Sequence, residues 1–465
     1  MLWRAIRLAA GFVVAVLVGA GLLVGSSLLP RDTVYANITR SVATLSAEGN
    51  HHAIPWVFNT FVSDNYTDAT MLNIAWIDPA PTGGVALPGT TTLGPVGTAL
   101  AGAFHAGGID QDPVRSLADR AATDGVSDTT YERYWHGYLP ILRTLLTFAS
   151  YAQIRSLLAL ALAALATGVG IGLVRRLGWG ALVAFVIGGV AIAGPVIAVN
   201  VQFVGVFFIA LTGMLAALHF APRLERTDIE LFAVLGAATS YIDFLTAPVV
   251  TLGLPLLVVL AAEARAALTD GADATAAATS PWRPWRRAIR ASLAWGGGYA
   301  LFWSAKWAIN AAFLPPSSVG SVGQDLATRF GLTYGLVERV VAVAKNVANI
   351  VPFSRPADRP LGVELTGDLA LYLGAFVVGT AVALIVAWFA LRRMRGASGL
   401  PLRQTAALLA VGALPYLWYF VVANHSSIHN FYTFRAQVVT AFAVGLFFVY
   451  SLNWKPKRGE VHQRG

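Results

Sequence analysis

The stretch AIRLAAGFVVAVLVGAGLLVGSSLL, residues 5–29, decides the fold class of this chain. Arg4 precedes it, as a basic residue precedes the apolar core of a secretory signal, but that core has only about 7–15 residues and this run is longer. A helix of about 20 apolar residues crosses the hydrocarbon core of a bilayer. We therefore expect residues 1–30 to form an uncleaved first transmembrane helix.

Further apolar stretches follow along the whole chain. Its 465 residues are 56% hydrophobic and 12% charged, with a mean hydropathy of +0.63, so a water-soluble fold could not cover its own apolar surface. Several stretches hold Gly and Pro, which membrane helices tolerate. The sequence predicts an all-α polytopic membrane protein of about ten transmembrane helices, with the other nine near residues 153–174, 178–195, 200–219, 228–243, 246–264, 290–312, 368–391, 404–423 and 434–453.

The basic residues indicate orientation. A net charge of +9 would suggest a nucleic-acid partner if it formed a patch on a soluble domain, but here the charges stand between apolar runs and no such partner is expected. With a cytoplasmic N-terminus every cytoplasmic connection is basic, whereas residues 31–137 hold five arginines against eleven acids. The abundance of Ala, Gly and Arg is typical of GC-rich bacterial genomes. We expect a multi-pass protein of the bacterial plasma membrane, with both termini cytoplasmic and the active face external.

This topology divides the chain into segments. The long loops are expected to hold helices of their own, some along the membrane interface, and the second has a helical pattern near residues 323–350. No cysteine is present, which excludes disulfides and thiolate metal sites. The expected segments are a first transmembrane helix at 1–30, an external loop with interface helices at 31–150, transmembrane helices 2–7 at 151–312, a second external loop at 313–367, transmembrane helices 8–10 at 368–454 and a cytoplasmic tail at 455–465.

Two acids in the first external loop are candidate catalytic residues. On a helix, Asp64 and Asp68 share one face at the i, i+4 spacing. Such a pair could hold a divalent cation, Mg or Mn, or one carboxylate with a raised pKa could act as a base. The alternative is a pair of solvated loop acids.

Aromatic residues precede the second apolar stretch. Tyr131, Tyr134, Trp135 and Tyr138 follow a helical spacing, which predicts an amphipathic helix at headgroup level. An aromatic belt explains these rings without a ligand. His136 and, further on, Arg143 are not explained by a belt, and they are candidate ligand contacts.

Two polar groups lie at the outer ends of later spans. Asp243 stands at the outer end of the stretch 228–243, where it is either solvated or lines a substrate site. Trp303, Lys306, Trp307 and Asn310 share one helix face. Lys306 lies inside the span, so it either snorkels to the headgroups or meets a phosphate in a cavity.

The densest polar segment is residues 424–435. If it is helical, His425, His429, Tyr432 and Arg435 form one stripe, next to Asn424. A His-x-x-x-His pair alone is a weak zinc signal. An anion clamp fits better, because Arg gives a planar fork for phosphate and imidazoles add donors; histidines facing water are the alternative.

All of these residues fall on the same predicted face. Basic residues beside an acid pair at a membrane boundary suit a reaction on a lipid-linked phosphate: cations hold the phosphate leaving group while a carboxylate deprotonates an acceptor hydroxyl. No nucleotide-binding motif is present. A site on the external face would use a donor without a nucleotide.

The order of these parts resembles the GT-C superfamily of integral-membrane glycosyltransferases, and the segments 64–68, 134–138, 303–307 and 424–429 also look similar to an uncharacterised set of bacterial multispan proteins. The resemblance covers nearly the whole chain as architecture. It implies transfer of a sugar from a polyprenyl-phosphate donor to a cell-envelope glycan, lipid or protein on the external face. No acidic doublet follows the first span, and Asp64 lies about 35 residues beyond it.

The resemblance also implies roles for individual residues. Asp64 would be the base, with Asp68 in metal binding or support. The donor phosphate would be bound by Arg435, Lys306, His425, His429 and Arg143, and the substrate lining would comprise His136, Tyr134, Trp135, Asp243, Trp303, Trp307, Asn310, Asn424 and Tyr432. Two other functions suit such a chain: a transporter or flippase of a lipid-linked precursor, and a non-catalytic subunit of an envelope-glycan assembly complex.

Overall fold

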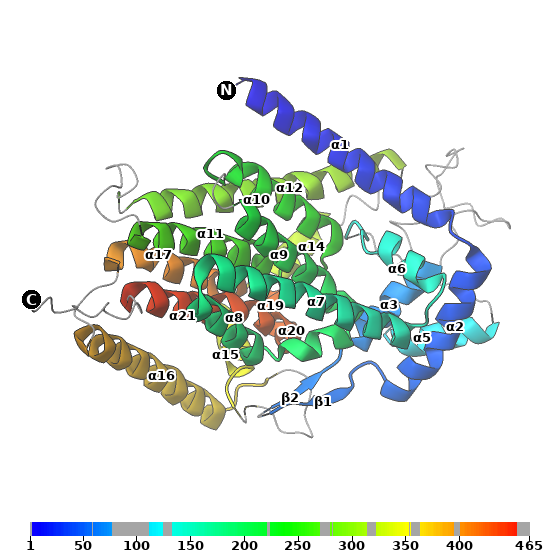
Figure 1. Ribbon diagram of the computed structural model, residues 1–465. Coiled ribbons are helices and arrows are strands. Elements are labelled where there is room, and N and C mark those ends of the chain that lie inside the picture. The colour runs from blue at the N-terminus through cyan, green and yellow to red at the C-terminus, as the bar shows by residue number, and fades with distance from the viewer. Residues whose placement is uncertain are drawn as a thin grey trace, which may run out of the picture.

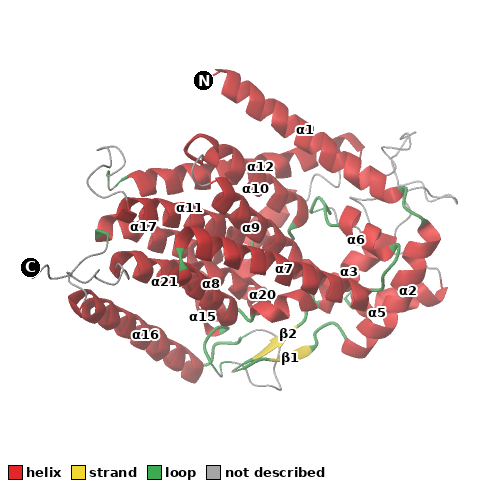
Figure 2. Ribbon diagram, viewed as in Figure 1, coloured by secondary structure: helices red, strands yellow, loops and turns green. Residues whose placement is uncertain are grey.

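The computed structural model is built almost entirely of helices (Figure 2). Its one sheet in the described residues is a hairpin of β1 (Ala53–Pro55) and β2 (Thr60–Val62), paired antiparallel. The structure describes residues 2–57, 59–76, 111–123, 133–220, 224–269, 280, 282–313, 322–352, 354, 363–394 and 400–452. The predicted tail at 455–465 and the predicted linker near 269–282, save its ends, lie outside these ranges.

Seven helices in the described part are long and apolar enough to cross a membrane. The chain is therefore a multi-pass membrane protein by length and composition. The seven windows are Ala9–Ser27 in α1 (Leu2–Ser27), Tyr151–Leu177 as α7, Val201–Phe220 as α9, Val249–Leu268 in α11 (Val249–Thr269), Gly367–Arg393 in α16 (Gly367–Met394), Leu402–Val421 over α17 (Leu402–Gly412) and α18 (Leu414–Val421), and Asn430–Leu452 over α20 (Asn430–Thr433), η3 (Phe434–Gln437) and α21 (Val438–Leu452).

Three predicted spans are helical but do not meet these criteria. Two of them are α10 (Leu224–Ile242) and α12 (Arg283–Phe313). The third, α8 (Trp179–Ala191), has 13 residues and rises about 20 Å, against about 30 Å for the hydrocarbon core. It ends early because Ala193 takes a left-handed backbone (φ 53°) before a short 3-10 helix, η1 (Gly194–Val199).

Helices α10 and α12 run parallel and very close together. Ala233 lies beside Gly298, and further along Tyr241 packs on Phe302. A Cβ on Gly298 would stand 2.1 Å from the Ala233 carbonyl oxygen, and one on Gly236 would stand 2.0 Å from that of Trp295. The two glycines therefore set the separation of this pair.

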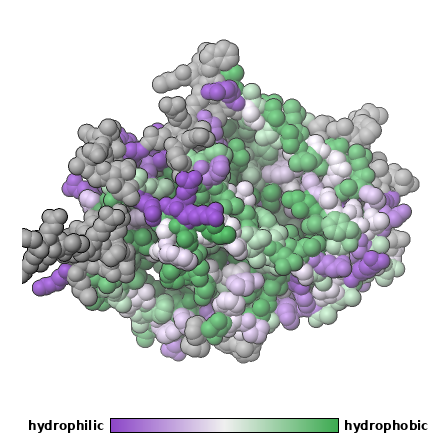
Figure 3. Space-filling model, in the orientation of Figure 1, coloured by the Kyte–Doolittle hydropathy of each residue, from purple (hydrophilic) through white to green (hydrophobic). Residues whose placement is uncertain are grey.

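Apart from Lys306, the described charged residues of α10, α11 and α12 gather at the opposite end of these helices from Asp243. Arg287 is buried and pairs with Glu263 and, at 3.5 Å, with Asp228; Arg290 also reaches Asp228, at 3.2 Å. This network lies in the region whose arginines were expected to be cytoplasmic. On the face shown in Figure 3, apolar residues cover the middle, and hydrophilic residues gather to the left and at the lower right.

Two cores hold the bundle together. The larger one is formed by α7 to α11, α17 and α21, with α11 at its centre. The smaller one joins α1 to the segment that precedes α7 and to Phe302 of α12. Helix α16 stands apart from both (Figure 1): only 6% of its most apolar window is buried, against 72% for α11, and Trp388 donates to Ser451 Oγ at 3.1 Å.

The first long loop is helical, as expected. Its described elements pack at one end of the bundle, at the right of Figure 1: α2 (Arg31–Glu48), α3 (Asn65–Trp76), α5 (Pro113–Thr123) and α6 (Leu139–Leu146), with the hairpin between α2 and α3. The second loop holds α14 (Val322–Phe330) and α15 (Leu336–Ala348), close to the helical stretch predicted there, and a short helix α19 (Ala423–Ile428) follows α18.

The neighbouring glycines 297 and 298 give a matched test of this packing. We expect Gly298→Ala to cost about 2 kcal/mol or more, since overpacking against a fixed backbone oxygen cannot relax. Gly297→Ala meets no atom within 4 Å and should gain about 0.5–1 kcal/mol from helix propensity. Thermal unfolding in detergent, followed by the gel-filtration peak that survives heating, measures both. Equal shifts for the two variants would contradict the close α10–α12 contact.

Candidate functional site

A buried carboxylate joins the first loop to the membrane bundle. Asp68 Oδ2 accepts hydrogen bonds from Tyr151 Oη (2.5 Å), Asn200 Nδ2 (2.9 Å) and the Val201 amide (2.9 Å), and its Oδ1 accepts one from the Gln202 amide (3.0 Å). The two amides open α9, where the helix dipole favours a negative charge. Asp68 therefore holds α3 against α7 and α9.

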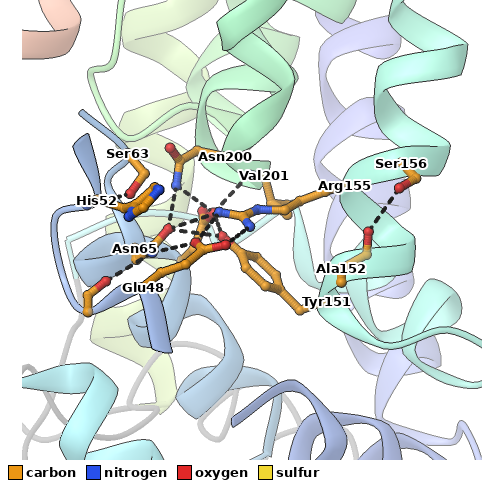
Figure 4. A network of polar contacts seen from close by, with 12 residues as sticks. Glu48, His52, Ser63, Asn65, Tyr151, Ala152, Arg155, Ser156, Asn200 and Val201 are labelled. Carbon is orange, nitrogen blue, oxygen red and sulfur yellow. Dashed lines mark hydrogen bonds and ion pairs between the residues drawn. The ribbon is translucent and has the colours of Figure 1, made fainter. Parts of the chain in front are cut away.

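A second layer supports this carboxylate (Figure 4). Arg155 binds Glu48 through two nitrogens, each at 2.7 Å, and also donates to Asn65 Oδ1 at 3.2 Å. Asn65 in turn donates to Glu48 at 2.9 Å, and the Arg155 guanidinium stacks over the Tyr151 ring. Sequence reasoning missed these residues. The one available signal was a charge, Arg155, inside an apolar stretch.

Asp64 caps the start of α3. Its Oδ1 accepts from the Thr67 amide at 3.1 Å and its Oδ2 from Thr67 Oγ1 at 2.8 Å, while its own amide donates to Asn200 Oδ1 at 2.9 Å. The side chain is buried. Burial raises the pKa of Asp64 to about 7 against the opposing hydrogen bonds from Thr67, and the negative charge of Asp68 adds to the rise. Such a carboxyl can take up and release a proton near neutral pH.

Arg435 is a cation whose charge acts on Asp64. It is 1% exposed and its guanidinium lies among Phe203, Phe434 and Phe61, at 4.6, 5.0 and 5.9 Å from the ring centroids. These three rings are called the aromatic enclosure below. The guanidinium interacts electrostatically with Asp64, but no ion pair within 4.0 Å joins the two in the described residues.

The unpaired edge of Arg435 is suited to an anion. Nη1 makes one long contact, 3.4 Å, with the Phe431 carbonyl oxygen. Nε and Nη2 have no hydrogen-bond partner within the part of the chain that the structure describes. These two nitrogens form one edge of the guanidinium plane, the edge that binds carboxylate or phosphate with two parallel bonds.

The predicted histidine stripe lies together, although its helix is broken into α19, α20 and η3. The rings of His425 and His429 are 4.6 Å apart and those of His429 and Tyr432 are 5.1 Å apart. Burial, with the nearby cation of Arg329, lowers the pKa of His429 to about 3 and holds the pKa of His425 well below its usual range. Both rings are therefore neutral at pH 7.

His425 is occupied by protein contacts. Its Nε2 lies 3.0 Å from the Leu245 carbonyl oxygen and its Nδ1 lies 2.9 Å from Arg329 Nη1. Because arginine can only donate, Nδ1 accepts and Nε2 donates. No ring nitrogen is left for a donor phosphate, so that role for His425 stays a prediction without support from its contacts. Arg329 of α14 is a cation that sequence reasoning missed, and Asn424 binds Tyr334 Oη beyond it, at 3.0 Å.

Arg143 lies elsewhere. Its Nε donates to the Ser26 carbonyl oxygen at 2.9 Å and its Nη1 to that of Ala75 at 2.6 Å. These oxygens end α1 and α3, where a cation is favourable. The contacts of Arg143 favour a structural role, and its proposed role on a phosphate stays a prediction.

The predicted amphipathic helix over the aromatic segment is wrong in its described part. Residues 133–138 form turns, and α6 begins only at Leu139. His136 takes a left-handed backbone (φ 56°) and contacts Tyr138 Oη at 3.1 Å. Trp135 is fully buried and donates to the Phe302 carbonyl oxygen at 2.8 Å, and Tyr134 packs on Phe244. The described rings are core residues instead of an interfacial belt, and Tyr131 lies outside the described residues.

The remaining candidates form a separate group. Asp243, Trp303, Lys306, Trp307 and Asn310 lie at the ends of α10 and α12, whose neighbouring residues Phe244 and Phe302 belong to the smaller core. Arg435 instead lies among rings of the larger core. The structure thus divides the single predicted site into two.

The two acids are already engaged by the protein. All four of their carboxylate oxygens accept hydrogen bonds from protein groups, and a role of either acid in holding Mg²⁺ or Mn²⁺ stays a prediction. Within the described residues no group of three His, Cys, Asp or Glu side chains could hold a metal ion. No step proposed below is routed through a metal.

Comparison with known proteins adds no family. No protein-family model matches the chain, and neither a curated protein nor a solved structure matches it. The fold defines a multi-helix membrane protein, and the function has to be argued from the site.

Asp68→Ala and Asp64→Asn compare what the two acids contribute to stability. Asp68→Ala leaves four buried donors without their acceptor and should cost at least about 3 kcal/mol. Asp64→Asn keeps an acceptor for the Thr67 amide and should change stability by no more than about 1 kcal/mol. Thermal unfolding of the two purified variants checks this. A greater loss for Asp64→Asn would reverse the assignment of the two acids.

Proposed function

We propose that this chain is a membrane glycosyltransferase that moves a sugar from a polyprenyl-phosphate donor to a cell-envelope glycan, lipid or protein. This proposal rests mainly on the unpaired Nε and Nη2 of the buried Arg435. The guanidinium lies in the aromatic enclosure and interacts electrostatically with Asp64. A buried cation with two unused donors needs an anion from outside the chain.

Arg435 is assigned the phosphate of the donor. Its paired donors match two phosphate oxygens, and the surrounding rings exclude water, so the attraction acts at low dielectric. Charge on the phosphate grows as the bond to the sugar breaks, and a fixed cation stabilises that change. Arg329, near the two histidines, is a second cation for the donor end.

Asp64 is assigned the base. The acceptor hydroxyl oxygen bonds to the anomeric carbon while the bond from that carbon to the phosphate oxygen breaks. The electron pair of the broken bond leaves with the polyprenyl phosphate, and the hydroxyl proton passes to the Asp64 carboxylate. The chemistry balances without a redox partner.

We also propose that the chain has the ten spans, the GT-C-like arrangement and the external active face expected from its sequence. This topology would place the site where polyprenyl-phosphate sugars are used. Asp64, Asp68, Asn200 and the turn after α10 all lie in the connections that this topology puts outside.

Envelope glycans of a deletion strain test the function. Mass spectrometry should show one envelope glycan shortened by one sugar, restored by the wild-type gene and not by Asp64→Asn. The purified chain in lipid nanodiscs should then form the same bond from a radiolabelled polyprenyl-phosphate hexose. Movement of that lipid across vesicles without a new glycosidic bond would establish a flippase instead, and activity only with a second subunit would show that the chain is not the catalyst.

The pKa of Asp64 predicts the pH profile. A base works only when deprotonated, so kcat/KM should fall about tenfold per pH unit below pH 7 and level off above it. Asp64→Asn should lower transfer at least about 100-fold at pH 8 and abolish this acid limb. Transfer rates from pH 5 to 9 measure both. A surviving acid limb in the variant would assign the base to another group.

Arginine geometry gives a second prediction for the donor end. Arg435→Lys keeps the charge and loses the fork, so the donor KM should rise about tenfold, while Arg435→Gln should lower kcat/KM about 100- to 1,000-fold. Arg120→Lys is the control, since Arg120 is buried but donates to the Asn73 carbonyl oxygen at 3.1 Å. Initial rates at varied donor concentration make the comparison. An Arg435→Lys variant with unchanged kinetics would remove the phosphate assignment.

A further inference from the structure

A second set of buried polar atoms lies near the ends of α10 and α12. Asn310 is fully buried, and Asp243, Ser240 and Trp307 are at most 9% exposed. In the described part of the chain, both amide atoms of Asn310, Trp307 Nε1, Asp243 Oδ2 and Ser240 Oγ have no hydrogen-bond partner. Buried polar groups are normally paired, so several such atoms in one region need an explanation.

The helix register orders these residues along α12. Tyr241 packs on Phe302, and α10 and α12 are parallel, so Ser240 and Asp243 lie near the level of Phe302, and Trp307 and Asn310 lie about one to two turns further along α12. Asp243 also interacts electrostatically with Tyr299. Tyr299, Trp303, Lys306 and Asn310 share one stripe of α12, and this stripe leads from Asp243 to Asn310.

Two indole rings line this stripe. Trp303 and Trp307 meet edge to face with centroids 5.8 Å apart. The Lys306 ammonium lies 3.5 Å from the Trp307 centroid, so the cation rests on a ring. The unused groups comprise donors, from Trp307 and Asn310, and acceptors, from Asn310 and Asp243.

We propose that this set, called the amide-indole site, binds a neutral saccharide, and that this saccharide is the acceptor of the transfer proposed above. A sugar offers hydroxyls that both donate and accept, and C–H faces that pack on indole rings. A phosphate would only accept, and it would leave Asn310 Oδ1 unpaired. The identity of the saccharide as acceptor rests on the proposed function; its binding here does not.

The position of the amide-indole site suits an acceptor. The turn that follows Asp243 contacts residues close to the two acids and the histidines. Gln202, whose amide binds Asp68, also donates through Nε2 to Thr246 Oγ1 at 3.4 Å. On the same turn, the Leu245 carbonyl oxygen contacts His425. Only the connection between α10 and α11 would therefore separate a glycan held at Asp243 and Asn310 from the elements that hold Asp64.

Binding can be measured without any transfer. The probe is the neutral oligosaccharide fraction released by mild acid from the envelope of the native host and of its deletion strain, titrated into the nanodisc-embedded protein while tryptophan fluorescence is followed. We expect saturable binding, weakened at least tenfold by Asn310→Leu and by Trp307→Phe. Ser304→Ala, an exposed change on the same helix, and Arg435→Gln should bind as the wild type.

Stability supplies the second measurement. Asn310→Leu replaces unpaired polar atoms with apolar ones of similar size, so the ligand-free variant should melt at or above the wild-type temperature. Loss of binding with retained stability supports the proposal. No saturable binding by the wild type, unchanged binding in Asn310→Leu, or binding lost only in Arg435→Gln would each overturn it, as would quenching by inorganic phosphate in place of the neutral fraction. An unaltered envelope in the deletion strain, with saccharide binding intact, would instead overturn the proposed transfer alone.

Discussion

The fold depends on the hydrogen bonds that Asp68 accepts. This one carboxylate receives the hydroxyl of Tyr151 at the start of α7, the amide of Asn200 and two amides at the start of α9. Without it, α3 would keep the contacts of Asn65 with Arg155 and of the Asp64 amide with Asn200, but the first amides of α9 would lose their acceptor. Asp64 owes its burial, and hence its raised pKa, to lying one turn before this anchor.

Three arginines differ in their contacts, with Arg143 and Arg435 buried and Arg155 partly buried. Arg155 uses both terminal nitrogens on Glu48 and Asn65, and Arg143 closes the ends of two helices. Arg435 has one long contact and an unused edge. Burying a charge without a partner is costly, which is why the proposed function assigns an anion to this edge. From the sequence, Arg143 and Arg435 are both predicted to bind the donor phosphate, and only their contacts distinguish them.

Much of the fold could be predicted because apolar runs of about 20 residues are a strong signal. The break after α8 could not, since it depends on the left-handed backbone of Ala193 within an unbroken apolar run. The spacing of the aromatic segment is compatible with a helix, but Gly137 lies under Tyr241, where a Cβ would be 2.3 Å from the ring, and this contact fixes a turn. Asp64 and Arg435 were found by residue type. Asn200, Tyr151 and Arg329, the partners of Asp64, Asp68 and His425, were not, because pairing across more than 80 residues leaves no local pattern.

The turn between α10 and α11 explains why the candidate residues are spread over the whole sequence. Leu245 takes a left-handed backbone (φ 66°), and its carbonyl oxygen accepts from His425, which accepts from Arg329 on its other nitrogen. This chain of contacts requires a neutral His425 with its proton on Nε2, and burial favours the neutral ring. Three connections that are distant in sequence are thereby fixed to one another at the same end of the bundle. Asp64, Arg435 and Asp243 belong to different parts of the chain, so their relative positions depend on buried polar contacts such as these.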